Sequence, residues 1–577
     1  MTGIPADGFT RYLRPHEMEA ELKQLTTTYP ALATLEQIGA SGEGRPLWAV
    51  TLTNSATGAA GDKPALYIDG NHHAGEVTSE MVCLYTIWQL LTGYGPDAAI
   101  TDLLDRYTFY VRPIVSPDGV EFYLTTPYTL RSTPQPYPHA DRAPGLHPED
   151  IDGDGVIAQM RIADPAGEWM VSDGDPRLLV RRREDERGGT YYRLYTEGQV
   201  VHDPADGPLD TAAITNAPAY WGLDFNRSYP HNWQPEYRQS GAGPYPLYPA
   251  ETRAGVDFVL DHPNIAAIVN YHTTGGFCFV LPSSRAPSEY PHDDLSGDYR
   301  LLSRKFSELT DQPLFQSYTE ATKTARFGSM MDWAYNQHGI FGWVPELWDM
   351  WGAAGVERRS EDFNQFFGGR SEADQLRLLA WNDSALEGQG FIPWRDFEHP
   401  QLGPVELGGW TYKFTTQNAP HAYLREICER HANWTAYLAR TLPLLTIAET
   451  TVEPFGDDAR LRRITVRVRN DGFLPTNLSK QALVTKSARP VEVTLAVAGA
   501  TIIDGAARQR LGHLPGRSVG AVPAWQAPTP ALSSGEARWI IRLDDDSPTD
   551  EGASAEITAS SPKAGVARET IRLTDTY

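Results

Sequence analysis

The sequence predicts an α/β domain with a mixed, mostly parallel sheet flanked by helices, followed by a C-terminal all-β sandwich. Up to position 349, short apolar runs that end in turn residues alternate with helical patterns, which is typical of buried, largely parallel sheets. After about residue 440, apolar and polar residues alternate with a period of two between turn signals. A chain of 577 residues is also too long for one ordinary core.

The first part of the chain supplies helices and strands in turn. Residues 16–30 predict a helix because Met18, Leu22 and Leu25 fall on one face. Residues 78–95 predict a second helix, with Thr78 as a candidate N-cap and glycine at its end. Apolar runs of strand length occur at 46–54, 64–73, 106–119, 264–276 and 341–349.

Two regions differ from this pattern. Residues 132–220 are rich in Pro, Gly, Asp and Arg, and they predict a long insertion of loops and short strands within a catalytic domain at 1–440. In residues 441–577, "LRRITVRVRNDG" alternates Ile464, Val466 and Val468 with polar residues, and four later segments repeat the pattern. We expect a β-sandwich accessory domain there.

Composition excludes several classes of protein. A net charge of -24 repels phosphate backbones, so we expect no nucleic-acid partner. The sequence contains no run approaching 18 apolar residues, so we expect no membrane partner. The three cysteines, Cys83, Cys278 and Cys428, imply no disulfide framework. The first residues lack a secretory signal, which favours a cytoplasmic protein, although a trimmed leader or leaderless export stays open.

Polar residues with metal-binding chemistry follow three of the predicted strands. His72, His73 and Glu76 lie in "GNHHAGE", although a hydrogen-bonded loop histidine is the alternative for either imidazole. His272 ends the run "NIAAIVNYH", and Glu346 interrupts the aromatic run "FGWVPELW", where a carboxylate is costly to bury unless it is paired or functional. Two imidazoles and one carboxylate are the protein ligands of a catalytic zinc, beside which a second glutamate can act as a base.

The order of the motifs makes this interpretation specific. "GNHHAGE", "SPDGVEF", "YTLR", "GLDFNRSY", "YHTTGG" and "VPELWD" together resemble the zinc metallocarboxypeptidases of the carboxypeptidase A type. The similarity covers roughly residues 10–435 and is interrupted by the insertion. The resemblance implies the zinc carboxypeptidase fold, one Zn²⁺ per chain, and hydrolysis of a C-terminal peptide bond in a peptide or related amide with a free carboxylate.

The resemblance also implies a role for each matching residue in the metal site. His73, Glu76 and His272 match the zinc ligands, and His73 is preferred to His72 because it occupies the register of H-x-x-E. Asp224 matches a carboxylate that orients the first histidine, a role with a general physical basis.

The remaining matches concern the substrate and the chemical step. Asn226 and Arg227 match the pair that binds the terminal carboxylate of the substrate. Arg131 matches the arginine that polarises the scissile carbonyl, and Glu346 matches the general base that activates the zinc-bound water. We therefore expect Arg131 and Glu346 to be the catalytic residues.

The sequence departs from the family pattern at several positions. Thr324 stands where the family has a tyrosine that closes over the substrate, and Gly75 replaces an arginine found in some members. The insertion begins at the carbonyl-polarising arginine, so we expect it to border the cleft. Met331, at the position that floors the family's side-chain pocket, is uncharged and favours apolar or aromatic C-terminal residues.

These departures leave two alternatives open. The scaffold could hydrolyse a non-standard amide, such as a peptidoglycan stem peptide, a γ-glutamyl tail or an N-acyl amino acid. The chain could also be a carboxypeptidase-like binding protein without chemistry, but such a protein usually lacks a ligand or the base. Metal content together with one activity assay separates these classes.

A second candidate metal site lies in the insertion. Asp150, Asp152 and Asp154, with Gly155, match the first half of a calcium loop. Arg161 occupies the twelfth position, where such a loop needs a glutamate. The alternative is a cluster of Asp/Gly turns whose carboxylates cap neighbouring backbone amides.

Overall fold

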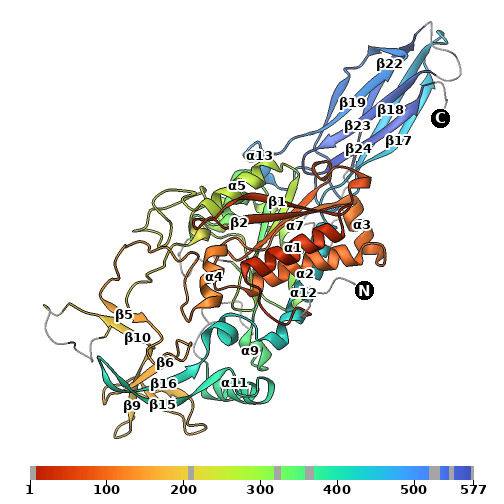
Figure 1. Cartoon of the computed structure of the whole chain (residues 1–577). Helices are drawn as coiled ribbons and strands as arrows, with labels where there is room; N and C mark the ends of the chain where they lie inside the picture. Colours follow the sequence, from red (N-terminus) through yellow and green to blue (C-terminus); the bar gives the residue numbers. More distant parts are fainter. Residues whose placement is uncertain are drawn as a thin grey trace.

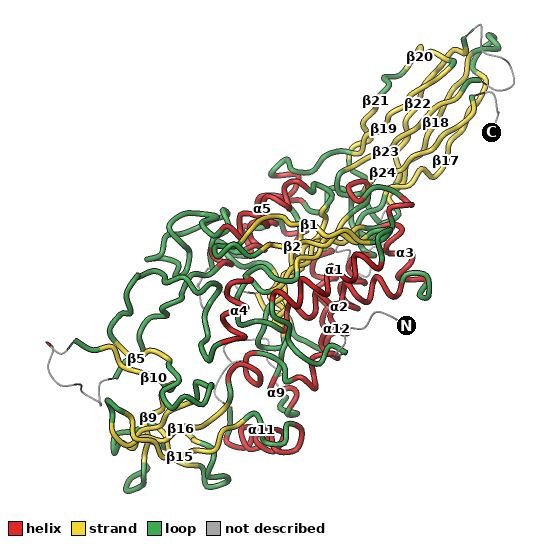
Figure 2. Tube along the Cα trace, in the orientation of Figure 1, coloured by secondary structure: helices red, strands yellow, loops and turns green. Residues whose placement is uncertain are grey.

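The computed structural model describes residues 8–203, 205, 209, 214–316, 326–357, 370–518, 533–544 and 552–573. Three parts lie in a row (Figures 1 and 2). A central α/β part carries most of the helices, an accessory sheet lies at one end, and a pair of antiparallel sheets lies at the other end.

The central part is built on an eight-stranded mixed sheet. Its order is β1 (Ala33–Ala40), β2 (Pro46–Leu52), β4 (Thr108–Arg112), β3 (Ala65–Gly70), β11 (Ile265–Tyr271), β14 (Phe341–Glu346), β12 (Phe277–Val280) and β13 (Leu314–Gln316). The pairs β4–β3, β3–β11, β11–β14 and β12–β13 are parallel, and the other three pairs are antiparallel. The predicted mixed, mostly parallel sheet is confirmed.

Helices cover the central sheet because their apolar faces pack against it. The two helices predicted from the sequence are present, and Met18, Leu22 and Leu25 are all buried on the first. The helices are α1 (Pro15–Thr28), α2 (Thr78–Gly93), α3 (Ala98–Arg106), α4 (Pro117–Thr125), α5 (Ala250–Asp261), α6 (His292–Ser296), α7 (Asp298–Thr310), α8 (Met330–His338), α9 (Met350–Ala353), α11 (Glu372–Ala385) and α12 (His421–Ala439). Helix α2 contacts β3 and α12, and α8 contacts β14.

The insertion forms more structure than its composition predicts. It contributes four strands to a six-stranded sheet whose other two strands come from the hairpin at 391–410. That sheet has the order β15 (Phe391–His399), β16 (Gly403–Trp410), β6 (Gln159–Ala163), β9 (Tyr191–Thr196), β7 (Trp169–Val171) and β8 (Leu179–Arg181), and β5 (Gly145–Pro148) pairs with β10 (Gly198–Val201) beside it.

A buried arginine joins the two segments of this accessory sheet. The Arg161 guanidinium lies between the rings of Tyr192 and Trp394, 4.6 Å and 4.5 Å from their centroids, and pairs with Glu406. The arginine that the sequence places at the twelfth position of a calcium loop therefore has a structural partner in the hairpin instead.

The C-terminal part consists of two four-stranded antiparallel sheets that share one apolar core. One sheet contains β17 (Leu445–Pro454), β18 (Leu461–Asn470), β22 (Ser534–Leu543) and β20 (Ala500–Asp504). The other contains β21 (Arg508–Gly512), β19 (Val491–Ala498), β23 (Ser554–Ser561) and β24 (Gly565–Arg572). The predicted sandwich is confirmed, and the side chains of Ile464, Val466 and Val468 point into its core.

The sandwich is attached to the central part through specific polar contacts. The Asp294 carboxylate accepts hydrogen bonds from the backbone amides of Lys480 and Gln481. On another face, Lys563 donates to the backbone oxygen of Ile265, the first residue of the central strand β11.

All three cysteines are free and buried. Among the described residues, no helix combines the length and apolar character needed to span a bilayer.

Candidate metal centre

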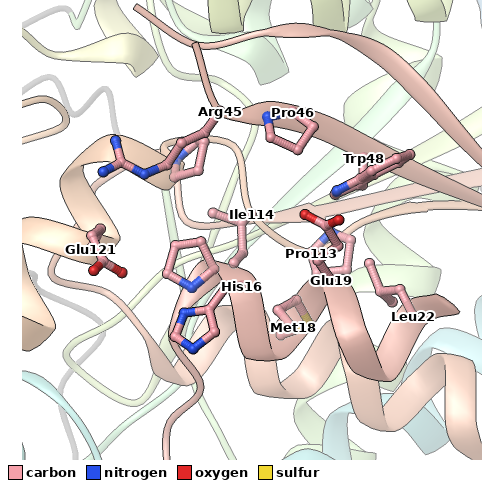
Figure 3. A pocket seen from close by; sticks show the side chains of 12 residues that line it. His16, Met18, Glu19, Leu22, Arg45, Pro46, Trp48, Pro113, Ile114 and Glu121 are labelled. Carbon is pink, nitrogen blue, oxygen red and sulfur yellow. The ribbon is translucent and has the colours of Figure 1, made fainter. Parts of the chain in front are cut away.

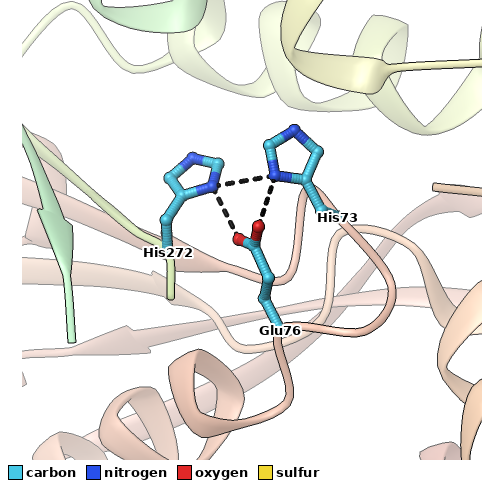
Figure 4. A group of neighbouring side chains, drawn as sticks. All are labelled: His73, Glu76 and His272. Atoms are coloured by element: carbon cyan, nitrogen blue, oxygen red, sulfur yellow. Dashed lines mark hydrogen bonds and ion pairs between the residues drawn. The ribbon is translucent and has the colours of Figure 1, made fainter. Parts of the chain in front are cut away.

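Three side chains from two distant parts of the sequence converge at one edge of the central sheet (Figure 4). We call His73, Glu76 and His272 the metal group. The Nδ1 atoms of His73 and His272 each lie 2.8 Å from a different carboxylate oxygen of Glu76, and 3.1 Å from each other. All three residues are buried. The structure therefore brings together the three residues that the sequence predicts as zinc ligands.

The parallel strands explain this convergence. Strands β3 and β11 are neighbours and run in the same direction, so the loop after Gly70 and the residue after Tyr271 emerge at the same edge. A side chain at position 70 would clash with the backbone of Ser79, which keeps the loop 71–77 close to the start of α2. Strand β14 adjoins β11 on its other side. The backbones of Glu346 and His272 form a parallel β-bridge there, so both residues lie at this edge of the sheet.

Each imidazole of the metal group has a partner on its other nitrogen. His73 Nε2 lies 3.1 Å from the Asp224 carboxylate, and His272 Nε2 lies 2.8 Å from the side-chain oxygen of Asn270. The Asn270 amide nitrogen donates to Asp69, which fixes the amide so that its oxygen faces His272. The partner of His73 is a carboxylate and the nearer partner of His272 is an amide oxygen, so both contacts favour a proton on Nε2.

The resulting set of atoms fits a divalent cation. With their protons on Nε2, both Nδ1 atoms present lone pairs toward the carboxylate oxygens of Glu76. Four acceptor atoms then meet in a buried site without a proton to share, which is unfavourable unless a cation lies among them. Imidazole nitrogen and carboxylate oxygen are the donors that zinc prefers in catalytic sites.

The alternative histidine has a different role. His72 Nε2 lies 2.8 Å from the Tyr229 hydroxyl, and its Nδ1 accepts a hydrogen bond from Asn270. His72 is fully buried, so its ring packs below the metal group instead of contributing to it.

A network of opposite charges surrounds the metal group. Arg131 Nε donates to the second oxygen of Asp224 at 2.8 Å, and its side chain is 40% exposed. Burial disfavours ionisation of Asp224, but the charges of Arg131 and Arg227 and the hydrogen bond from His73 outweigh it and hold the pKa of Asp224 well below its usual range. Asp224 therefore positions both the first histidine and the arginine.

Glu346 lies at the end of β14 beside this network. Burial, and then the nearby Glu76 carboxylate, raise the pKa of Glu346 well above its ordinary value, while Arg131, Arg326 and Arg227 act in the opposite direction. A raised pKa makes this carboxylate a stronger proton acceptor, as a general base requires.

The predicted pair for a substrate carboxylate also lies at the site. Asn226 Oδ1 accepts from the backbone amide of Met330, and Asn226 Nδ2 lies 3.3 Å from His272 Nε2. Arg227 donates to the backbone oxygen of Asn226, and within the described residues no carboxylate lies within ion-pair distance of its guanidinium. Thr324, the position of the missing tyrosine, lies outside the described residues.

The candidate calcium loop is locally ordered by its own backbone. Asp150 accepts hydrogen bonds from the amides of Gly153 and Gly155, and Arg395 pairs with Asp152 and Asp154. The structure also brings Glu197 within reach of Asp150 and Asp152. Glu197 was not predicted as part of this site because it immediately precedes β10 and lies outside the loop at 150–155. Calcium binding stays a prediction.

Two hollows border the central part. The larger, about 1460 Å³, lies between the accessory sheet and the segment 410–416, and it is lined by aromatic residues that include Trp169, Trp351 and Tyr412. The smaller, about 270 Å³, lies between α1, β2 and α4 (Figure 3). Arg45 in the smaller hollow already pairs with Asp118. Tyr123 and Lys413 in the lining of the larger hollow accept hydrogen bonds from the Asn418 side chain, which also donates to Gly75 O beside Glu76.

Comparison with protein families matches most of the central part and the sandwich. The model described as zinc carboxypeptidase matches residues 18–155 and 183–355, which together are more than half of the chain. A model described only as a domain of unknown function matches residues 444–572.

Individual relatives align over shorter stretches. Carboxypeptidase A2 of Rattus norvegicus is 34% identical over 125 residues, covering 22% of this chain and 29% of the relative. Metallocarboxypeptidase A of Trichophyton tonsurans is 40% identical over 107 residues, covering 18% of this chain and 25% of the relative. The chain thus spans less than a third of the length of these curated relatives.

The solved structures to which the chain is similar are more distant in sequence. A crystal structure of thrombin activatable fibrinolysis inhibitor is 17% identical with a TM-score of 0.42, covering 76% of this chain and 75% of that chain. Carboxypeptidase A of Helicoverpa armigera is 16% identical with a TM-score of 0.39, covering 66% of this chain and 74% of that chain.

Proposed function

We propose, because this chain belongs to the zinc carboxypeptidase family, that it is a zinc-dependent carboxypeptidase that hydrolyses C-terminal peptide bonds. The observation that carries the proposal is the convergence of His73, Glu76 and His272 in a buried site next to Glu346. The three residues would hold the zinc through two Nδ1 atoms and the carboxylate. When bound, the ion would supply Lewis acidity to the site.

Two residues of the chain would carry out the proton transfer and the charge stabilisation. Glu346 would take a proton from the attacking water and pass it to the departing amine nitrogen. Arg131 would donate hydrogen bonds to the oxygen of the scissile carbonyl as negative charge develops there, an effect typically worth ~3–4 kcal/mol per donor. Its Nε is held by Asp224 and its Nη1 lies 3.9 Å from the Glu76 carboxylate, so the guanidinium of this partly exposed side chain faces the metal group, where the carbonyl would lie.

The restriction to C-terminal bonds would come from Asn226 and Arg227. Arg227 has no carboxylate partner among the described residues, so the free carboxylate of a substrate can provide one. Asn226 is fixed by Met330 and lies next to His272, so a carboxylate bound by this pair would lie close to the metal group.

A hydrolase of a non-standard amide is the alternative that a structural observation favours. The hollow of about 1460 Å³ against the accessory sheet would offer room for a longer or branched substrate, since two of its lining residues contact Asn418, which donates to Gly75 O beside Glu76. A binding protein without chemistry is disfavoured, because all three residues of the metal group and Glu346 are present and brought together.

One experiment tests the proposed function directly. The zinc-loaded protein is incubated with a peptide library in two forms, with free and with amidated C-termini, and the products are identified by mass spectrometry. We expect stepwise release of single C-terminal residues from the free acids only, and zinc at one ion per chain. Equal cleavage of the amides, or internal cleavage, would reject the assignment, and release from γ-linked or stem peptides alone would select the alternative.

The calcium prediction has a separate test. If the loop at 150–155 binds calcium, millimolar Ca²⁺ raises the melting temperature of the zinc-loaded protein, and Asp150→Asn removes the increase. An unchanged melting temperature would support the alternative of Asp/Gly turns closed by Arg395.

A further inference from the structure

A short segment that precedes α8 packs directly on the residues proposed to bind the substrate carboxylate. Met330 N donates to Asn226 Oδ1 at 2.9 Å, and Tyr229 N donates to Gly328 O at 3.0 Å. A Cβ atom at Gly328 would collide with the backbone oxygen of Arg227. The segment that begins at Arg326 is therefore held against the 226–229 turn.

The side chain of Arg326 lies on the wall of the same site. Its Cζ is 4.8 Å from the centroid of the Phe279 ring. Phe279 on β12 pairs with Val344 on β14, two residues before Glu346. The guanidinium thus covers the strand pair that leads to the proposed general base.

The electrostatic surroundings place Arg326 in the same group of charges. Burial lowers the pKa of Arg326, the neighbouring cations Arg227 and Arg131 lower it further, and Glu346 and Asp224 act in the opposite direction. These interactions show that the charges of the metal site and of Arg326 share one partly buried region.

The cations of this region are only partly balanced by the protein. Arg131 pairs with Asp224. Within the part of the chain that the structure describes, neither Arg227 nor Arg326 has a carboxylate within ion-pair distance. Partly buried cations without an anion are unfavourable, so two negative groups from a ligand would be bound there.

We propose, on the basis of the carboxypeptidase function above, that Arg326 binds a second carboxylate, carried by the side chain of the C-terminal residue. Arg227 with Asn226 would bind the main-chain carboxylate, and Arg326 the side-chain carboxylate. The substrates would then end in a dicarboxylic residue, which is glutamate or aspartate in a protein peptide and diaminopimelate in a peptidoglycan stem peptide.

This inference differs from the expectation that Met331 alone provides. Met331 is buried against Gly342, and its role as an apolar floor of the side-chain pocket stays a prediction. The positive charge would come from Arg326, which lies five positions before Met331. An apolar floor beneath a guanidinium suits the methylene groups of a glutamate side chain.

The test uses pairs of substrates that differ in charge and hardly in shape. N-acetylated tripeptides ending in Glu or Gln, and in Asp or Asn, are compared by kcat/KM with the full-length, zinc-loaded protein, together with a stem peptide ending in diaminopimelate. We expect the acid to be preferred over its amide by about tenfold or more, as for a charge-assisted hydrogen bond. The faster of the glutamate and diaminopimelate peptides identifies the source of the dicarboxylate.

Three variants separate the explanations. Arg326→Met should reduce the Glu/Gln ratio to near one, and Arg326→Glu should favour peptides ending in Lys, a gain that misfolding cannot produce. Arg463→Met is the matched control, because Arg463 lies 4.8 Å from the Phe455 ring centroid in the C-terminal sandwich, and it should keep the wild-type ratio.

Binding gives a readout that does not depend on turnover. Calorimetry with the Glu346→Gln protein should show weaker binding of the Glu-ended peptide after Arg326→Met is added. A wild-type Glu/Gln ratio of one or less, or a ratio that survives Arg326→Met, would overturn the role of Arg326 while leaving the carboxypeptidase function intact. Failure to release a residue from any peptide would instead reject the proposed function.

Discussion

The side-chain oxygen of Asn270 lies 2.8 Å from His272 Nε2, on the side of the ring away from Glu76. This contact sets the tautomer of His272 and aims its Nδ1 at the metal group. Removing such an outer partner typically lowers metal affinity 10–100-fold. We expect Asn270→Ala to weaken zinc binding by about this factor, measured by competition with a chelator of known affinity.

The control for this variant is a second buried asparagine near the start of the same strand. Asn264 donates to the backbone oxygens of Ala60 and Lys63 and does not contact the metal group. Asn264→Ala should therefore lose stability without losing zinc affinity. Equal zinc affinities in Asn270→Ala and the wild-type protein would show that Asn270 does not position His272.

Glu346 should be required for turnover but not for metal binding. It pairs with His272 through the backbone and its side chain is not part of the metal group. In Glu346→Gln we expect kcat to fall by ~10²–10⁴ while zinc remains at one ion per chain, as measured by elemental analysis. Glu251→Gln changes a buried glutamate that accepts from Gly42 N, and it should keep wild-type kcat. Near-normal kcat in Glu346→Gln would assign the base elsewhere.

Asp224 couples the metal group to Arg131, since its two oxygens contact His73 Nε2 and Arg131 Nε. Asp224→Asn removes the charge that holds both, so at saturating zinc we expect kcat to fall by about 10²–10³, similar to Arg131→Ala. Because the two residues act in one chain of contacts, the double variant should be little worse than Arg131→Ala alone. Additive losses would mean that the two side chains act independently.

The sequence predicted the metal group because its three residues follow strands that share one edge. The register of H-x-x-E selected His73, and in the structure the His72 ring contacts Tyr229 instead of joining the metal group. Asn270 was not predicted. It lies inside the apolar strand β11 without a spaced motif, and its role depends on how its amide is fixed by Asp69.

The mixed central sheet and the C-terminal sandwich were predictable because both depend on local periodicity. The accessory sheet was not, since β6 pairs with β16 and Arg161 meets Glu406 across 245 positions of sequence. Pairing between strands so far apart in the sequence depends on which sheet edges the rest of the fold leaves unpaired. Arg326 was not predicted for the same reason, because its contact with Phe279 joins two segments that share no motif.

The attachment of the sandwich should depend on pH through Lys563. This lysine donates to Ile265 O at 2.6 Å, and burial lowers its pKa from 10.5 to about 7. Because its pKa is lower in the folded protein than in the unfolded chain, the folded state binds this proton less readily. Its contribution to stability is therefore complete above pH 10.5 and is lost as the pH falls through about 7.

We therefore expect the wild-type melting temperature to fall more steeply between pH 9 and pH 6 than that of Lys563→Met, which cannot take up a proton. Melting is followed by calorimetry, which resolves the sandwich if it unfolds separately. Lys305→Met is the control, because Lys305 is a surface lysine paired with Glu308, and its removal should leave the wild-type slope. Identical slopes for Lys563→Met and the wild-type protein would show that Lys563 stays protonated through this range.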